Sequence, residues 1–249
     1  MKQAAALAKR WLLAFFVPRP LIGIFFFPRF IRHWFSYRNK AADEKPRFID
    51  SYPCLTDWTQ YTPFDPHYFF QGAWLARRLQ QQKPALHVDL GSSVLTISTV
   101  SAHVDTVFVD YRPIKANLKG MTPVAGNIVN LPFASNSLAS LSCLHVIEHI
   151  GLGRYGDPID PQGSIKAAHE LQRVLKRGGL LYLSVPVGRK RVDFNAHRVF
   201  APNHVPELFE QLQLLEFSYV DDSGTFYENW NSVDAANNQY ACGMYLFSK

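Results

Sequence analysis

The sequence has few cysteines, and none of them forms a recognisable pair. Cys54, Cys143 and Cys242 are an odd number at wide spacings, with no CxxC pair among them. A disulfide framework needs paired cysteines, so this set is typical of a protein kept in a reducing compartment. A secretory signal peptide is also disfavoured, because no small-residue cleavage site follows the first apolar run, residues 11–17. We therefore expect a cytoplasmic protein.

The sequence also lacks an apolar stretch long enough to cross a membrane. Two apolar runs lie near the N-terminus, at residues 11–17 and 21–27, and Pro18, Arg19 and Pro20 separate them. A spanning helix needs about 20 largely apolar residues in line. Aromatic side chains mixed with basic ones instead favour a segment that lies in the membrane interface. We predict peripheral attachment to the inner face of the membrane. The alternative is an apolar arm packed on its own domain or on a second copy.

Positive charge is not in excess over most of the chain. The net charge is +6, but the first 42 residues hold eight basic and no acidic side chains, which leaves −2 for the rest. A nucleic-acid-binding domain carries its basic patch on the folded part, interleaved with stacking aromatics. We therefore expect no nucleic-acid partner. The change in composition divides the chain into an apolar, basic N-terminal segment, residues 1–44, and a folded domain, residues 45–249.

From residue 86 onwards, short apolar runs alternate with segments of helical length. This alternation predicts βαβ units, and therefore an α/β fold with a mostly parallel sheet of seven strands flanked by helices. The expected strands are residues 86–90, 106–109, 124–128, 138–144, 180–185, 214–220 and 241–247. The expected helices are residues 67–82, 94–102, 164–175 and 204–212. A glycine in the stretch from Lys176 to Gly179 is expected to end the third helix as a left-handed cap.

Short motifs follow one another along this region. They are HVDLGSS at residues 87–93, VFVD at 107–110, GNIVNLPF at 126–133, LHVIEHI at 144–150 and KRGGLLYLSVP at 176–186. In this order they resemble the motifs of class I S-adenosylmethionine-dependent methyltransferases, whose fold is Rossmann-like. More narrowly, NAHRVF at residues 195–200 and the lead-in from about residue 50 resemble methyltransferase-like proteins found among bacterial surface-polysaccharide genes.

The resemblance implies S-adenosylmethionine as the cofactor. Gly91 matches the first glycine of the loop after the first strand, whereas Ser93 and Leu95 stand where the family usually has two further glycines. Asp110 lies about 20 residues after Asp89, where the family places an acceptor for the ribose hydroxyls. Asn127 replaces the aspartate that usually contacts the adenine, and its amide oxygen can still accept a hydrogen bond. The expected cofactor-binding residues are Asp89, Gly91, Ser93, Asp110, Tyr111, Asn127, Ile128 and His145.

Three interpretations remain open for His145, Glu148 and His149, which follow the fourth expected strand. One of them could act as a general base on an acceptor hydroxyl. A divalent metal could be held by them together with His197, although we predict no metal. They could also be structural, as the polar end of a buried strand. The same letters match an inverted zinc-peptidase motif, but that motif lies within a helix, and here an apolar strand leads into it.

The expected function is methyl transfer from S-adenosylmethionine to a hydroxyl group by a membrane-associated enzyme. The resemblance implies a polysaccharide or a lipid-linked sugar as the acceptor, and His145, Glu148 or His149 would take the proton. The alternative is a non-catalytic methyltransferase-like module, recruited to the membrane as a partner of glycan-assembly enzymes. The replaced glycines favour this module, whereas the retained Asp110 and the His-Glu cluster favour the enzyme.

Overall fold

The computed structural model describes residues 19–249 of the chain. Its internal contacts divide the chain into two units, Met1–Phe64 and Asp65–Lys249. Residues 45–64 thus group with the N-terminal unit, whereas the composition placed the boundary after residue 44. The first apolar run, residues 11–17, lies outside the described part. The membrane role of residues 1–44 stays a prediction.

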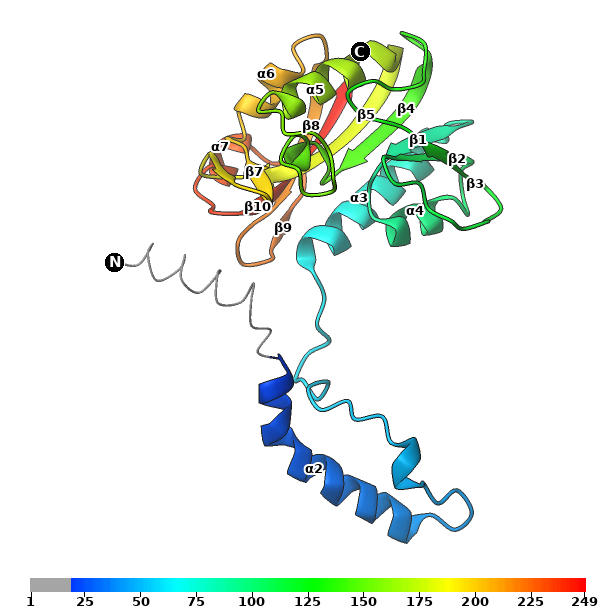
Figure 1. Cartoon of the computed structure of the whole chain (residues 1–249). Helices are drawn as coiled ribbons and strands as arrows, with labels where there is room; N and C mark the ends of the chain where they lie inside the picture. Colours follow the sequence, from blue (N-terminus) through cyan, green and yellow to red (C-terminus); the bar gives the residue numbers. More distant parts are fainter. Residues whose placement is uncertain (1–18) are drawn as a thin grey trace. The chain divides into compact units, whose positions relative to one another are not determined.

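A long helix is the main secondary-structure element in the described part of the N-terminal unit. This helix, α2 (Arg19–Lys40), is followed by a single 3-10 turn, η1 (Phe48–Asp50) (Figure 1). Arg29 joins the helix to the later segment, because its guanidinium donates to the Leu55 carbonyl (2.9 Å) and lies 4.5 Å from the centre of the Trp58 ring. Phe25 on the same helix is 83% exposed. Within residues 19–249, no helix has the length and apolar character needed to cross a membrane.

Eight strands form one sheet in the C-terminal unit, in the order β3-β2-β1-β4-β5-β10-β8-β9. The strands from β3 to β5 run parallel, whereas β10 is antiparallel to both β5 and β8. Their bounds are β1 (His87–Leu90), β2 (Thr106–Asp110), β3 (Met121–Ala125), β4 (Leu138–Leu144), β5 (Leu175–Val187), β8 (Gln213–Val220), β9 (Phe226–Tyr227) and β10 (Ala241–Ser248). The α/β fold with a mostly parallel sheet is confirmed. The count is eight and not seven, because the two-residue β9 pairs with the end of β8 and is too short to leave a pattern.

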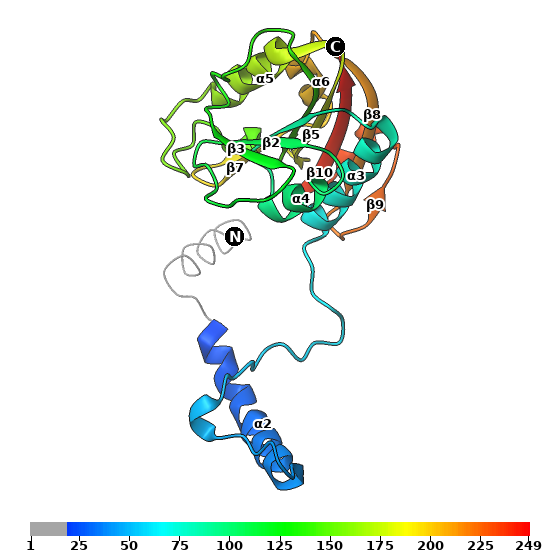
Figure 2. The ribbon, with the colours of Figure 1, turned by 90° about the vertical axis from the view of Figure 1, so that its right-hand side faces the viewer.

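Helices cover both faces of the sheet (Figures 1 and 2). Leu181 and Leu183 of β5 belong to the core that α5 (Gly163–Val174) and α6 (His204–Leu208) also enter. Tyr182, between them, belongs to the core formed with α3 (Pro66–Gln82) and α4 (Val94–Val100). Side chains alternate between the faces of a strand, so a strand covered on both faces reads as a continuous apolar run. This is why β5 was visible in the sequence.

The helix ends follow local chemistry. Asp65 caps α3, since its carboxylate accepts hydrogen bonds from the backbone N–H groups of His67 (2.9 Å) and Tyr68 (3.3 Å). The expected glycine cap of α5 is wrong: the helix ends at Val174, and Leu175 is already extended. Gly178 does take a left-handed conformation (φ +71°), but it lies inside β5, where the pairing with β4 shifts register. The cap of α3 fixes where its first turn begins.

A small hairpin brings a distant segment to the end of β4. It consists of β6 (Arg191–Asp193) and β7 (His197–Val199), and a short 3-10 turn, η2 (Ile147–His149), follows β4. Arg198 of β7 donates to the carbonyl of Ile150 (2.7 Å) and to that of Glu148 (3.3 Å). The NAHRVF segment therefore lies against the His-Glu motif.

Candidate functional site

A cavity of about 270 Å³ opens where β1, β2 and β4 end. In parallel sheets, ligands bind in this position, beyond the carboxyl ends of the strands. Most residues predicted to form the site line it: Gly91, Asp110, Tyr111, Asn127, Ile128, His145 and His149. Asp89, Ser93 and Glu148 do not. The loop after η2 also contributes to the lining, through residues that include Tyr155, Asp157 and Asp160.

Asp89 holds the loop that begins the cavity wall. Its carboxylate accepts hydrogen bonds from the Ser92 N–H (3.0 Å), the Ser92 hydroxyl (2.6 Å) and the Ser142 hydroxyl, and it is 0% exposed. Burial raises the pKa of Asp89 to about 6, although these hydrogen bonds act in the opposite direction. Direct contact of Asp89 with a cofactor stays a prediction. In the structure its role is to position the loop.

Gly91 brings that loop close to the end of β2. Its backbone is left-handed (φ +63°), and a Cβ atom would lie 3.4 Å from Oδ2 of Asp110 and 3.5 Å from Val146. Glycine is therefore favoured here by conformation as well as by space. Asp110 accepts the Arg112 N–H through Oδ1 (2.6 Å), and Asn127 accepts the Val129 N–H through its side-chain oxygen (3.1 Å). Ser93, expected in this set, precedes α4 without a capping hydrogen bond.

His145 has both ring nitrogens engaged. Nδ1 lies 2.8 Å from Oε1 of Glu148, and Nε2 lies 3.3 Å from Sγ of Cys242. Burial lowers the pKa of His145, but Cys242 and Glu148 raise it by more, to about 10. The ring is aimed by an unusual backbone conformation, since φ is +56° at His145. A protonated ring without a free nitrogen is poorly suited to act as a base at neutral pH.

His149 differs from His145 in having a free ring nitrogen and a lowered pKa. Its Nδ1 lies 2.6 Å from the Ala196 carbonyl, which can only accept, and 3.3 Å from the Arg154 guanidinium, which can only donate. The shorter contact assigns the hydrogen to Nδ1 and leaves the lone pair on Nε2. Nε2 lies 3.6 Å from Oε1 of Glu148. Burial lowers the pKa of His149, which keeps the ring neutral near pH 7. His149 also lines the cavity, so it is placed to accept a proton there.

Glu148 lies between the two histidines. It is 0% exposed, and its Oε2 has no hydrogen-bond partner among the described residues. A buried carboxylate oxygen without a partner is costly, and such atoms often mark functional places. Glu148 therefore acts on the site through the histidines and not by lining the cavity.

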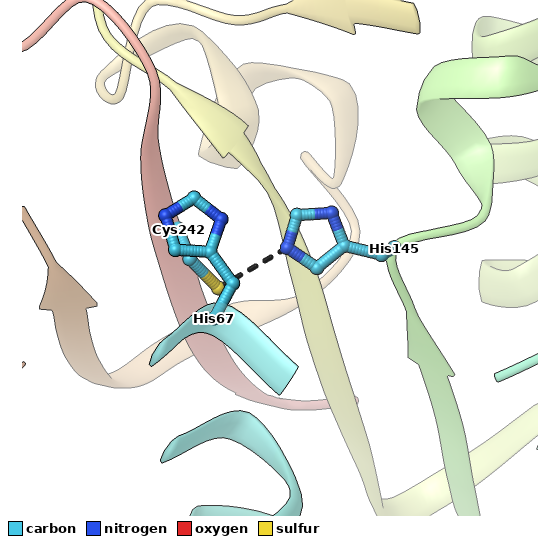
Figure 3. Close-up of side chains that lie close together, drawn as sticks. All are labelled: His67, His145 and Cys242. Atoms are coloured by element: carbon cyan, nitrogen blue, oxygen red, sulfur yellow. Dashed lines mark hydrogen bonds between the residues drawn. The ribbon is translucent and has the colours of Figure 1, made fainter. Parts of the chain in front are cut away.

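Sequence reasoning missed two residues next to His145. His67 comes from the first turn of α3, and Cys242 from the start of β10 (Figure 3). One ligand atom from each of His67, His145 and Cys242 lies within 4.8 Å of the others. His197, considered as a metal ligand beside His145, Glu148 and His149, instead pairs with Asp193 (3.3 Å). The sequence predicts that a helix starts after Asp65-Pro66. No local pattern, however, links His67 to residues at the end of β4 and the start of β10.

Solved structures with similar folds include methyltransferases and a cyclase. A candidate sarcosine dimethylglycine methyltransferase from Galdieria sulphuraria is 16% identical, with a TM-score of 0.54, over 73% of this chain and 85% of that one. The 1,6-didemethyltoxoflavin-N1-methyltransferase of Burkholderia thailandensis was solved with S-adenosylhomocysteine. It is 13% identical, with a TM-score of 0.51, over 74% of this chain and 78% of that one. The [4+2]-cyclase SpnF is 11% identical, with a TM-score of 0.52, over 71% of this chain and 80% of that one. At these identities the likeness shows the fold, which is that of class I methyltransferases.

Within that fold class, the chain belongs to a family described as "Caenorhabditis protein of unknown function, DUF268", which matches residues 88–239. The uncharacterised protein MJ0638 of Methanocaldococcus jannaschii is 23% identical over 159 residues, or 61% of this chain. The match spans 64% of the length of that relative. These similarities define the fold and the family, and neither description names a reaction. One of the folds above belongs to a cyclase, so the fold alone does not specify methyl transfer.

Proposed function

We propose that this protein transfers a methyl group from S-adenosylmethionine to a hydroxyl group of a polysaccharide or a lipid-linked sugar. The observation that carries the proposal is the cavity beyond β1, β2 and β4, where Gly91, Asp110 and Asn127 lie together beside His149. Gly91 and Asp110 match the methyltransferase motifs, Asn127 stands where the motif usually has an aspartate, and a structural neighbour was solved with S-adenosylhomocysteine.

The residues of the cavity fit the proposed cofactor. Asp110 offers a carboxylate at the end of β2, and the left-handed turn at Gly91 leaves the space beside it free of a side chain. The Asn127 side chain and Ile128 lie across the same cavity, where a polar group and an apolar surface suit an adenine ring. When bound, S-adenosylmethionine supplies an electrophilic methyl group, and the protein has to align the acceptor and take up its proton.

His149 is the proposed general base. Its free Nε2 lone pair and lowered pKa suit removal of a proton from a hydroxyl at neutral pH. Glu148, with Oε1 3.6 Å from that nitrogen, stabilises the positive charge that forms on the ring. Both ring nitrogens of His145 are already engaged, by Glu148 and Cys242, so His145 contributes position and not a free lone pair.

Arg112 and Tyr155, which line the cavity, and Arg154, which contacts Tyr155, support an anionic sugar acceptor. The guanidinium of Arg112 lies 4.4 Å from the centre of the Tyr155 ring, and that of Arg154 lies 5.1 Å from it. Aromatic faces suit sugar rings, and guanidinium groups suit phosphates. Exposed apolar side chains of the N-terminal unit support the same assignment, since a lipid-linked acceptor is found at a membrane.

The first experiment is calorimetric titration of the full chain with S-adenosylhomocysteine. We expect micromolar binding, and Asp110→Ala should weaken it by about 1–3 kcal/mol, the loss of a hydrogen bond to a charged group. Asp57→Ala, at an exposed aspartate of the N-terminal unit, is the matched control and should bind as the unsubstituted chain does. If a folded sample binds no S-adenosylhomocysteine, the enzyme proposal fails and the non-catalytic module is favoured.

The acceptor is tested by incubating the chain with methyl-labelled S-adenosylmethionine and a lipid-linked sugar fraction. His149→Ala should lower the rate of label transfer by about 10²–10⁴, the usual effect of losing a general base, while S-adenosylhomocysteine binding persists. The control is His204→Ala, because that histidine pairs with Glu207 (2.6 Å) outside the cavity lining. Equal rates for both variants would remove His149 from the role of base.

A further inference from the structure

We propose that His67, His145 and Cys242 form a binding site for one Zn²⁺ ion. Each offers one ligand atom, and these atoms all lie within 4.8 Å of one another. The three side chains come from three separate elements, α3, the end of β4 and β10, and converge in Figure 3. This site does not depend on the proposed methyl transfer.

The geometry is close to that of a bound ion. Nε2 of His145 and Sγ of Cys242 are 3.3 Å apart, and the rings of His67 and His145 are nearly parallel, with their centres 5.7 Å apart. Zn²⁺ binds nitrogen at about 2.0–2.1 Å and thiolate sulfur at about 2.3 Å in a tetrahedron. Ligand atoms of one ion are therefore only a few ångströms apart, and small side-chain movements would close the site.

The surroundings of His145 match those of a metal-bound histidine. With Nε2 directed at the sulfur, Nδ1 donates to Oε1 of Glu148 (2.8 Å). A carboxylate behind a ligating histidine is the usual arrangement, because it fixes the ring and its tautomer. The left-handed backbone of His145 (φ +56°) costs about 1 kcal/mol or more for a residue with a Cβ atom, which the contacts of a bound ion would offset.

Charge balance also favours a divalent ion. A thiolate and two neutral imidazoles leave one positive charge on a bound Zn²⁺, and the buried Glu148 carboxylate provides one negative charge beside it. Glu148 Oε1 accepts from His145, whereas Oε2 has no hydrogen-bond partner among the described residues. Nitrogen and sulfur ligands select Zn²⁺ over Mg²⁺, which prefers oxygen. Three protein ligands leave a fourth position, as in catalytic zinc sites.

The test uses the full chain, stripped with a chelator and titrated under reducing conditions with Co²⁺ and then Zn²⁺. Co²⁺ reports the ligands, because a thiolate gives a charge-transfer absorption that imidazoles do not. We expect one equivalent of Co²⁺ with this band, displacement by Zn²⁺, and no displacement by Mg²⁺. Cys242→Ser should abolish the band and His67→Gln should weaken binding at least about tenfold, whereas Cys54→Ser, at an exposed cysteine, should change neither.

Glu148→Gln tests whether Glu148 supports the ligand His145 without binding the metal itself. It should keep the thiolate band but lower metal affinity by about 10–100-fold, the effect of losing a carboxylate behind a ligating histidine. Circular dichroism of each variant checks that it is folded. If the buried Cys242 variant unfolds, the unsubstituted chain still decides the matter. A folded chain that takes up no stoichiometric Co²⁺, or takes it up without a thiolate band, overturns the proposal, as does a band that survives in Cys242→Ser.

Discussion

Asp89 shows how a single buried carboxyl group couples the loop of the site to pH. Its pKa is raised from 3.8 to about 6, mainly by burial. The folded state therefore binds the proton more tightly than the unfolded state does. The contribution of Asp89 to stability is greatest below about pH 4 and is lost as pH rises towards 6, by about 3 kcal/mol in all, since one pKa unit corresponds to about 1.4 kcal/mol.

We predict that Asp89→Asn removes this pH dependence. The amide keeps the size of the side chain, and the hydroxyls of Ser92 and Ser142 can rotate to suit it. In urea unfolding, the free energy of unfolding of the variant relative to that of the unsubstituted chain should rise by up to about 3 kcal/mol between pH 4 and pH 7. Parallel stability curves for the two proteins would show that burial of the ionised form is not costly here.

At the scale of residues, the cavity was more predictable than the cluster beside it. Gly91, Asp110 and Asn127 each lie at or just after the end of a strand within a local motif, and parallel strands bring such positions to one edge of the sheet. Cys242 reaches His145 only because β10 inserts antiparallel between β5 and β8. That pairing is long-range, so no spacing along the chain reveals it.

Helix α3 is joined to β8 by a network of charged side chains. Arg78 donates to both carboxylate oxygens of Glu216 and also to Glu228 (3.2 Å), and the Trp74 indole donates to Glu216 (2.9 Å). The side chains of Arg78 and Glu216 are only 8% and 16% exposed. Removing one member of such a pair leaves a nearly buried charge without its partner.

We predict that Arg78→Met lowers the free energy of unfolding by about 3–5 kcal/mol, the range for breaking a buried ion pair. Arg77→Met, at the exposed neighbour on the same helix, is the matched control and should change it by less than about 0.5 kcal/mol. Glu216→Met added to Arg78→Met should recover most of the loss. Equal effects of the two arginine variants in denaturant unfolding would mean that the network contributes little.

The sequence pattern located most elements but not all of their ends. The apolar runs of β4 and β10 were visible because both faces of these strands are covered. Helix α6 is shorter than expected: it ends at Leu208, and Phe209 turns away from helical geometry (φ −117°, ψ 44°) with its side chain buried. Tertiary burial of one aromatic side chain thus overrides a helical pattern.

Helix α2 is the element on which membrane attachment can be tested. We predict that the full chain co-sediments with vesicles containing anionic lipid, and that Phe25→Ser weakens this about tenfold or more, since burying a phenylalanine contributes about 1.5–3 kcal/mol. Phe194→Ser is the control, because Phe194 is 72% exposed in the C-terminal unit and Phe25 is 83% exposed in α2. If both variants bind vesicles equally, α2 is not the membrane contact.

At the scale of the whole molecule, the basic N-terminal segment and the folded unit that holds the cavity are separate parts of the chain. The first 42 residues carry eight positive charges and no negative ones, whereas the remainder carries a net charge of −2. The sheet, the cavity and the three proposed zinc ligands all lie within Asp65–Lys249. A unit with its own core on both faces of a sheet is expected to fold alone.

We therefore predict that a fragment comprising residues 65–249 folds, binds S-adenosylhomocysteine within about threefold of the full chain, and no longer associates with anionic vesicles. At a ligand concentration of 100 times Kd, both proteins should gain about 2.7 kcal/mol of stability, because the ligand binds the folded state alone. A fragment starting at Lys45, the boundary expected from composition, should behave in the same way. A folded 65–249 fragment that binds S-adenosylhomocysteine much more weakly than the Lys45 fragment would show that residues 45–64 contribute to the cavity, and that the functional boundary lies where composition first placed it.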